Sequence, residues 1–485
     1  MRSQKKQGRS VTHVGGYSLY AILFLLSAVV LIIITPLFQK GTFIDGLLYQ
    51  TVAYNASQHQ ATFWNMKFTD TSMSFFCEQP PLYFELLSWY YSLIPNRWWA
   101  DHLFTLSLLI LLIVFLAQLF KSLPVKTSAP TSLSLLFLVS IPVFCWSYAN
   151  QILEPLVCIE MVLAIWLFVR YLKSPNLWLA VLFGGNIVLL FLSKGFQSCF
   201  IIALPLCYAV LHKFRKDLLV FSALASVIAL ILIGGLIFFY APAKAWFQCY
   251  YQSRLVLTMN NVGATTDSHF EIIGRFFSEL IPVFILLLFA FLWLINKYRL
   301  SIRHILRHFS ANSLALALLM VSFLGSFPFA LSLVQRGFYL LPALLCFVLS
   351  LVIGFSRYWQ LMYHHLQTAL TRVWLRSAVV LIFFGSMTIS VFTIGEYKKD
   401  ESLLEDLALI EPLLNQGDTL GVSESLWNNF SLHAYLYMDK QVNLIGSEQQ
   451  PAYQLTPKEA AADSSLNAYQ KVMLPTRAFD LWTRR

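Results

Sequence analysis

Charged residues are scarce in this sequence of 485 residues, and cysteines are few. Asp, Glu, Lys and Arg make up only 12% of the chain, about half of the proportion that is usual in soluble domains. The seven cysteines include no Cys-x-x-Cys pair and form no disulfide framework. The last 90 residues lack a glycine-rich phosphate loop and a catalytic triad, and the rest of the chain lacks an internal repeat. These absences exclude a soluble globular protein and a disulfide-stabilised scaffold.

Hydrophobic residues take the place of the missing charges. They make up 58% of the chain and include 41 Phe, 22 Tyr and 13 Trp. Many apolar stretches are long enough to cross roughly 30 Å of hydrocarbon, which predicts a mostly α-helical, polytopic membrane protein with about eleven transmembrane helices. No small-residue cleavage site follows the first stretch, so we expect it to be retained as a span. The expected spans are 17–38, 102–120, 131–148, 154–170, 176–192, 197–211, 218–241, 279–295, 311–331, 338–355 and 377–395.

Lys and Arg residues are distributed unevenly between the two sets of connecting segments. The N-terminal segment and the loops on its side hold 18 of the 34 Lys and Arg residues, whereas the opposite loops hold 8. Cytoplasmic loops carry such an excess of basic residues. We therefore expect a cytoplasmic N-terminus and, after an odd number of spans, a C-terminus on the opposite face. The same bias explains the net charge of +10 without nucleic acid as a partner.

The chain divides into two predicted domains. Residues 1–395 form the transmembrane domain, which includes a large first outer loop at 39–101. From residue 396 charge increases and the apolar runs shorten, which predicts a small extracytoplasmic α/β domain at 396–485. Its expected strands are 420–422, 442–445 and 472–474, and its expected helices are 426–437 and 457–462.

Ionisable residues at the outer boundary of the membrane are costly unless they pair or act. The main candidates are Asp45, Glu78, Glu154, Lys194, Arg254 and Arg336. Carboxylates and cations at one membrane depth suit the transfer of a sugar from a polyprenyl phosphate. Cations neutralise the leaving phosphate, and a carboxylate removes the proton from the acceptor hydroxyl.

The acidic candidates have structural alternatives. Asp45 is either the general base or the N-cap of a helix that starts near Gly46 and includes Tyr49. Glu78 is either a site residue or a solvated loop residue, and Glu154 is either catalytic or an N-cap. Glu78 and His269 are also candidate ligands for a divalent metal, although a lone His in a polar loop is usually only solvated.

The remaining candidates either bind the donor phosphate or position the backbone of the site. Lys194 and Arg336 either contact phosphate or extend to the lipid headgroups, and Arg254 is a third candidate phosphate ligand. Pro80 and Pro81 fix the backbone after Gln79, which gives them a positional role. Cys77 and Cys249 both lie in outer loops, where they either form a disulfide or are buried as small hydrophobic residues.

The order of these motifs resembles a known family. An Asp follows the first span, and then come Glu78-Gln79-Pro80-Pro81-Leu82, Glu154-Pro155, Lys194-Gly195 and Arg336-Gly337-Phe338-Tyr339-Leu340-Leu341-Pro342. Over residues 17–395 this order is similar to bacterial polyprenyl-phosphate-dependent glycosyltransferases of the protein O-mannosyltransferase superfamily, and most of all to the lipid A aminoarabinose transferases.

The resemblance implies a role for several residues. It makes Asp45 the general base, places Glu78, Glu154, Lys194 and Arg254 in the site, and implies a bacterial inner membrane. Two departures concern the donor sugar. Many relatives have Asp-Glu followed two residues later by Arg-Tyr, whereas this chain has Asp45-Gly46-Leu47-Leu48-Tyr49, and Gln79 replaces the usual Lys or His before Pro-Pro.

The predicted function is therefore transfer of a sugar, with inversion, from a polyprenyl-phosphate donor to lipid A, another glycan or a protein on the periplasmic face. A transporter or flippase of lipid-linked sugars is one alternative, but it would place ionisable groups near mid-span. A ligase or polymerase of surface polysaccharide is the other, and it would place its long loop late in the chain. Whether Asp45, Glu78 and Lys194 face one cavity distinguishes these hypotheses.

Overall fold

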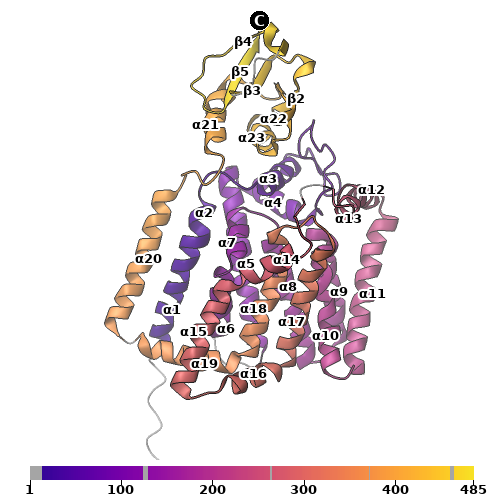
Figure 1. The fold of residues 1–485 in the computed structure, drawn as a ribbon. Helices are drawn as coiled ribbons and strands as arrows, with labels where there is room; N and C mark the ends of the chain where they lie inside the picture. The colour runs from indigo at the N-terminus through magenta and orange to yellow at the C-terminus, as the bar shows by residue number, and fades with distance from the viewer. Residues whose placement is uncertain (1–13, 124–128, 263–264, 371, 459–463) are drawn as a thin grey trace, which may run out of the picture.

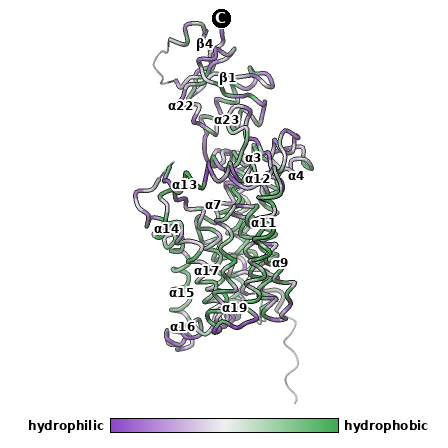
Figure 2. Tube along the Cα trace, turned by 90° about the vertical axis from the view of Figure 1, so that its right-hand side faces the viewer, coloured by the Kyte–Doolittle hydropathy of each residue, from purple (hydrophilic) through white to green (hydrophobic). Residues whose placement is uncertain are grey.

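The structure is a computed structural model that describes residues 14–123, 129–262, 265–370, 372–458 and 464–485. A bundle of long helices forms one part of the molecule, and a small domain with a β-sheet stands on one end of it (Figure 1). The long helices are hydrophobic along their length, and hydrophilic residues collect at the two ends of the bundle and in the small domain (Figure 2). This distribution is what a protein that crosses a bilayer requires.

Nine helical segments in the described part of the chain are long and apolar enough to cross a membrane, or ten if one bent pair counts as a span. The bent pair is α6 (Ala129–Val139) and α7 (Pro142–Ala149), which meet at 83°. The nine segments are Leu19–Leu37, Arg97–Ser122, Glu154–Lys173, Leu177–Leu211, Lys216–Phe239, Ile281–Tyr298, Ser313–Leu331, Gly337–Gly354 and Val373–Thr393. Five of them are single helices: α5 (Arg97–Ser122), α8 (Glu154–Lys173), α11 (Lys216–Phe239), α15 (Ile281–Tyr298) and α20 (Val373–Thr393). The first segment consists of α1 (Val14–Val29), η1 (Val30–Ile34) and α2 (Thr35–Leu37), and the fourth of α9 (Leu177–Lys194), η2 (Gly195–Ala203) and α10 (Leu204–Leu211). The seventh joins α17 (Ser313–Ser326) to η4 (Phe327–Leu331), and the eighth joins η5 (Gly337–Leu340) to α18 (Leu341–Gly354).

The difference from the expected eleven spans lies in the segment 177–211. The chain folds back within it, because the Ser198 hydroxyl donates to the Leu190 carbonyl at 2.6 Å and Cys199 Sγ lies 3.9 Å from the Ile187 carbonyl. In one straight helix, residues 187 and 199 would lie about 18 Å apart. The returning leg, η2 and α10, rises about 30 Å in all, the thickness of the hydrocarbon layer. The segment therefore forms the two passes expected from the sequence, joined at Lys194 and Gly195.

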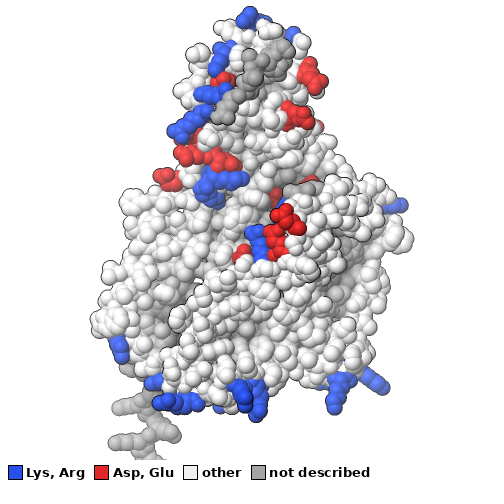
Figure 3. Space-filling model, viewed as in Figure 1, with Lys and Arg blue, Asp and Glu red and all other residues white. Residues whose placement is uncertain are grey.

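The two ends of the bundle carry different short helices. At the end near the small domain lie α3 (Ile44–Ser57), α4 (Leu82–Leu93), α12 (Ala241–Tyr250), η3 (Tyr251–Val256), α13 (Leu257–Met259) and α14 (Glu271–Glu279), whereas α16 (Ile302–Ser310) and α19 (Ser356–Ala369) lie at the other end (Figure 1). The face drawn in Figure 3 shows only basic side chains at the end that carries α16 and α19, and a broad uncharged band above them. Basic residues thus gather at the end that the charge bias predicts to be cytoplasmic.

The small domain contains one five-stranded sheet in the order β2-β1-β3-β5-β4. Strand β1 is parallel to β2 and β3, and β5 is antiparallel to β3 and β4. The strands are β1 (Thr419–Val422), β2 (Asn443–Gly446), β3 (Tyr453–Pro457), β4 (Tyr469–Lys471) and β5 (Phe479–Arg484), and the helical segments are α21 (Glu401–Ile410), η6 (Glu411–Leu413), α22 (Glu424–Trp427), α23 (Phe430–Lys440), η7 (Ser447–Gln449) and η8 (Ser464–Ala468). Buried apolar residues between 403 and 481 form its separate core.

The expected elements of this domain are partly correct. The first two expected strands match β1 and β2, and the helix at 426–437 forms as α22 and α23. The strand expected at 472–474 is wrong, because β4 ends at Lys471. The helix expected at 457–462 is also wrong at its start, because Pro457 lies in β3, and residues 459–462 lie outside the described residues. The proposed boundary at residue 396 falls just after α20, which ends at Thr393.

The small domain packs against the first outer loop. Helix α23 contacts α3, and the Tyr437 hydroxyl donates to Asp70 at 3.1 Å. Arg97, at the start of α5, forms an ion pair with Asp439. Lys398 joins the two parts of the molecule as well, since its ammonium donates to the carbonyls of Pro36 and Ala149 at 2.8 and 2.5 Å. The domain therefore covers the helix that carries Asp45.

Candidate active site

Asp45 lies in the first turn of α3, and the start of this helix rests on the turn between α7 and α8. The backbone amide of Phe43 donates to Asn150 Oδ1 at 3.0 Å. A Cβ atom on Gly46 would lie 2.1 Å from the Asn150 carbonyl oxygen, so only glycine permits this close approach. The missing second acid of the family pattern thus has a structural reason, because a larger residue at position 46 does not fit here.

The Asp45 carboxylate is not a helix cap. Phe43 is the N-cap residue, and no side chain caps the helix, which makes the N-cap alternative wrong. Within the described ranges, no residue forms a hydrogen bond or an ion pair with this half-buried carboxylate. Burial and then the charge of Glu78 raise the pKa of Asp45, whereas Arg254, Lys194 and Arg336 act in the opposite direction. Four of the other five charged residues predicted for the site therefore lie within electrostatic range of Asp45.

Glu154 and Lys194 form a buried ion pair beside this group. Their side chains are 1% and 3% exposed. The Lys194 ammonium also lies 4.9 Å from the centre of the Tyr339 ring and 5.5 Å from that of Phe338. Lys194 does not extend to lipid headgroups, and Leu153 is the N-cap of α8 (Glu154–Lys173). Both structural alternatives for this pair are therefore wrong, and in this conformation each residue binds the other.

The Lys194-Gly195 turn meets the Pro-Pro segment and α12. Gly195 has φ = +72°, and a Cβ atom there would lie 2.6 Å from the Tyr250 hydroxyl oxygen and 3.7 Å from Pro80 Cγ. Pro80 and Pro81 are both buried and lead directly into α4. Three segments that are distant in the sequence thus pack together, and the positional role of the two prolines stays a prediction.

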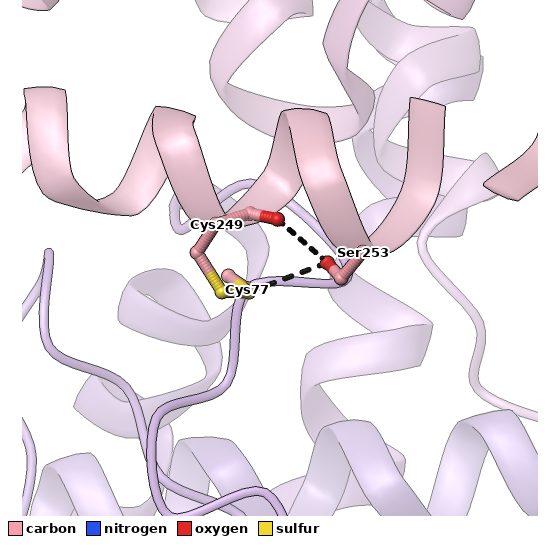
Figure 4. Close-up of a disulfide and its surroundings, with 3 residues drawn as sticks. All are labelled: Cys77, Cys249 and Ser253. Atoms are coloured by element: carbon pink, nitrogen blue, oxygen red, sulfur yellow. Dashed lines mark hydrogen bonds between the residues drawn. A yellow bond between two sulfur atoms is a disulfide. The ribbon is translucent and has the colours of Figure 1, made fainter. Parts of the chain in front are cut away.

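Cys77 and Cys249 form a disulfide, with their Cα atoms 5.9 Å apart (Figure 4). This confirms the first of the two alternatives for these cysteines. Glu78 follows Cys77 directly, and its carboxylate lies 3.7 Å from the Arg254 guanidinium on η3. Both side chains of this ion pair are 36% exposed, so they remain accessible from the outer surface.

Two cavities include other charged residues of this group in their linings, whereas Asp45 and Lys194 line neither of them. The first has a volume of about 400 Å³ and combines polar residues with an apolar wall, and its lining includes Glu78, Gln79, Tyr250, Arg254, Tyr339, Phe196, Phe200, Leu324 and Phe329. The second has a volume of about 450 Å³, and its lining includes Phe43, Trp146, Glu271, Arg275, Glu279, Arg336 and Phe338. Asp45 is within electrostatic range of Glu78 and Arg254 in the first cavity and of Arg336 in the second.

The metal hypothesis gains no support. His269 is exposed, and its Nδ1 lies 2.9 Å from the Ala330 carbonyl oxygen, whereas Glu78 is paired with Arg254. In the part of the chain that the structure describes, no group of three His, Cys, Asp or Glu residues is arranged to hold a metal ion.

Sequence reasoning missed three residues that help to build the site. Asn150 holds the start of α3, and Tyr250 and Tyr339 line the first cavity. Tyr339 lies within the Arg336 motif, which was the one available signal.

Tyr49 lies on α3, the helix in which the sequence predicted it, and its ring is buried against Tyr83 and Phe84. Burial and then the charge of Asp45 raise the pKa of Tyr49 well above the ordinary value.

Comparison with solved structures identifies the fold of this chain. No family model and no curated protein matches the sequence. Structures of ArnT, a lipid A aminoarabinose transferase, from Cupriavidus metallidurans are similar in the apo state and with undecaprenyl phosphate bound, with TM-scores of 0.62 and 0.60 and identities of 13% and 12%. Each alignment covers 96% of this chain and 98% of ArnT. The archaeal oligosaccharyltransferase AglB from Archaeoglobus fulgidus, in complex with an inhibitory peptide and a dolichol phosphate, gives a TM-score of 0.50 at 12% identity over 91% of this chain and 69% of its own. The resemblance predicted from the sequence is confirmed at the level of the fold.

Proposed function

We propose that this protein transfers a sugar from a polyprenyl-phosphate donor to a hydroxyl group of an envelope acceptor, with inversion at the sugar C1. The observation that carries the proposal is the Asp45 carboxylate, which has no bonded partner in the described chain and lies within electrostatic range of Arg254, Lys194 and Arg336. An unpaired base within electrostatic range of several cations matches a reaction that needs proton removal and stabilisation of a leaving phosphate.

We assign the donor to the first cavity. Its apolar wall, formed by Phe196, Phe200 and Leu324, suits a polyprenyl chain, and Arg254 at its polar side suits the phosphate. Gln79 lines the same cavity and contributes no charge. We assign Lys194 an indirect role, because its charge is neutralised by Glu154 in this buried pair and is not free to contact the phosphate directly.

We assign the acceptor to the second cavity. The Trp146 and Phe338 rings are stacked there with centroids 5.7 Å apart, and the Phe43 and Trp146 rings form a T-shaped pair with centroids 4.9 Å apart. Such an aromatic surface suits the face of a sugar ring, and Arg275 and Arg336 in the same cavity suit a phosphate group on an acceptor glycan or lipid. Lipid A has both a sugar ring and a phosphate group, and other envelope glycans are further candidate acceptors.

The reaction follows from this arrangement. Asp45 accepts the proton of the acceptor hydroxyl as its oxygen attacks C1 of the donor sugar. The bond between C1 and the phosphate oxygen breaks on the opposite side, and Arg254 stabilises the charge of the departing polyprenyl phosphate. One displacement at C1 gives inversion, and no step requires a metal ion.

We place the site on the periplasmic face of a bacterial inner membrane, with the N-terminus in the cytoplasm and the C-terminal domain outside. The positively charged end of the bundle and the position of the small domain at the opposite end support this orientation (Figures 1 and 3). An outer location also suits the disulfide between Cys77 and Cys249.

The experiment is a comparison of lipid A and glycan masses in cells with and without the gene, complemented by either the parent protein or Asp45→Asn. We expect one envelope component to lose a sugar in the deletion strain and to regain it only with the parent protein. Identical mass profiles in all strains would contradict the proposed function.

A further inference from the structure

We propose that the Cys77–Cys249 disulfide is a positioning device for the donor site, which fixes Glu78 against Arg254 and makes donor binding depend on the oxidised state of the protein. This inference rests on the proposed function, and it concerns residues outside the reacting group.

The disulfide is a covalent link between two segments of the outer face that are distant in the sequence. Its cysteines are separated by 172 residues in the sequence. On one side, residues 58–81 contain turns and bends with two isolated backbone bridges, at Thr62–Asn65 and Met66–Phe76. On the other side, Cys249 lies near the end of α12, at the rim of the bundle. The Trp64 ring also links these segments, because its centroid lies 5.9 Å from that of Trp246 and 6.4 Å from that of Tyr240, the N-cap residue of α12.

The residues next to each cysteine are the charged residues of the first cavity. Glu78 is adjacent to Cys77, and Arg254 follows Cys249 by five residues on the continuous helical run of α12 and η3. Ser253 lies on η3, which is a π-helix, and connects it to the disulfide. The Ser253 hydroxyl donates to the Cys249 carbonyl at 2.8 Å and lies 3.5 Å from Cys77 Sγ (Figure 4). A movement of either cysteine would therefore move one member of the Glu78–Arg254 pair.

The ion pair cannot hold this geometry by itself. Its closest charged atoms are 3.7 Å apart, and both side chains are 36% exposed. Exposed pairs of this kind contribute little and are screened by salt. The covalent bond limits the separation of the two backbones regardless of salt, and a π-helical turn is a conformation that often occurs at functional sites.

Reduction of the disulfide removes this constraint on the two backbones. A phosphine such as TCEP, with one water molecule, donates two electrons to the disulfide, so that the S–S bond breaks, two S–H bonds form, and the phosphine becomes its oxide. Both cysteines lie outside the membrane-crossing segments, Cys77 in the first outer loop and Cys249 on α12. We therefore expect the reduced protein to remain folded while its donor site becomes loose.

The test measures transfer by the full-length protein in vesicles, with a polyprenyl-phosphate sugar as donor. We expect TCEP to raise the donor KM of the parent about tenfold, as for the loss of one charge-assisted hydrogen bond, with a smaller change in kcat. Reoxidation should restore the KM. The double variant Cys77→Ser, Cys249→Ser should show the raised KM without TCEP and no response to TCEP, and Cys207→Ser, which removes a buried free cysteine on α10, should behave as the parent.

A second comparison separates positioning from simple stabilisation. In an Arg254→Gln background, loss of the disulfide should raise the donor KM no further, because both changes disrupt the same contact. If loss of the disulfide raised the donor KM of Arg254→Gln by the same factor as it raises that of the parent, the proposal would be overturned. A fully reduced parent, verified by the mass of its maleimide adduct, that unfolds at a lower temperature but keeps its donor KM would also overturn it.

Amide hydrogen exchange keeps this proposal distinguishable from the proposed function, because it requires no transfer. Reduction should accelerate exchange in 58–81 and 241–256 and leave the transmembrane helices unchanged. Local acceleration in a protein that transfers no sugar would contradict the proposed function and leave the positioning role in place. Unchanged exchange in both segments would overturn the positioning role.

Discussion

Single residues at the outer membrane boundary were the most predictable part of the site. The cost of an unpaired charge near hydrocarbon identified Asp45, Glu78 and Lys194 from the sequence alone. The ion pair between Glu154 and Lys194 was not predictable, because these residues are 40 positions apart and no spacing rule joins them. Tyr250 was missed for another reason, since one tyrosine among 22 carries no signal by itself.

The pH dependence of transfer is a prediction about Asp45. The carboxylate must be ionised to accept a proton, so activity should fall as pH decreases through its raised pKa. Glu78 raises the pKa of Asp45, and Glu78→Gln should therefore move the acidic limb of the kcat/KM profile to lower pH, whereas Arg254→Gln should move it to higher pH. An acidic limb that stays in place in both variants would show that another group is titrating.

The buried pair predicts an asymmetry between single and double variants. Lys194→Ala leaves the Glu154 charge buried without a partner and should reduce the free energy of unfolding by about 3–5 kcal/mol. Lys194→Met combined with Glu154→Gln removes both charges and should recover most of that loss. Thermal unfolding in detergent measures both, and equal stability of Lys194→Ala and the parent would show that the pair opens easily.

At the scale of elements, hydrophobic length predicted the spans but not their internal breaks. The expected division of 177–211 into two passes matches the reversal at Gly195, because a Lys-Gly pair is unfavourable inside a hydrocarbon-crossing helix. The 83° bend between α6 and α7 and the π-helical turn η3 were not predicted. Both depend on tertiary packing, which leaves no periodic signature in the sequence.

The contact between α3 and Asn150 gives the prediction at this scale. Gly46→Ala places a Cβ atom 2.1 Å from the Asn150 carbonyl oxygen, so α3 must shift and move Asp45. We expect transfer to fall at least tenfold, since small displacements of a catalytic group are costly. Gly185→Ala is the matched control, because its Cβ atom has no neighbour within 4 Å. Similar activities of the two variants would contradict this view of α3.

At the scale of the whole molecule, charge bias and composition predicted the arrangement of the two parts. The sequence predicted that the last 90 residues lie on the same face of the membrane as the first outer loop, and the structure packs α23 against α3. The specific contacts, such as Arg97 with Asp439, could not be predicted, because they join segments more than 300 residues apart.

The membrane orientation is the prediction at this scale. A periplasmic reporter enzyme fused after Arg485 should be active, and a cytoplasmic reporter at the same position should be silent. Fusions in the basic loop near Lys213 serve as the control and should give the opposite result. A cytoplasmic signal after Arg485 would place the disulfide and the candidate site on the wrong face.

The most direct test of the account is the transfer rate of Asp45→Asn in vesicles that contain a polyprenyl-phosphate sugar and an envelope acceptor. The amide has the same shape but cannot accept the proton of the hydroxyl group. Transfer should therefore fall by about 100- to 10,000-fold, while binding of undecaprenyl phosphate stays at the parental level. A variant that binds the lipid phosphate normally and transfers sugar at the parental rate would show that Asp45 is not the base, and the central claim would be wrong.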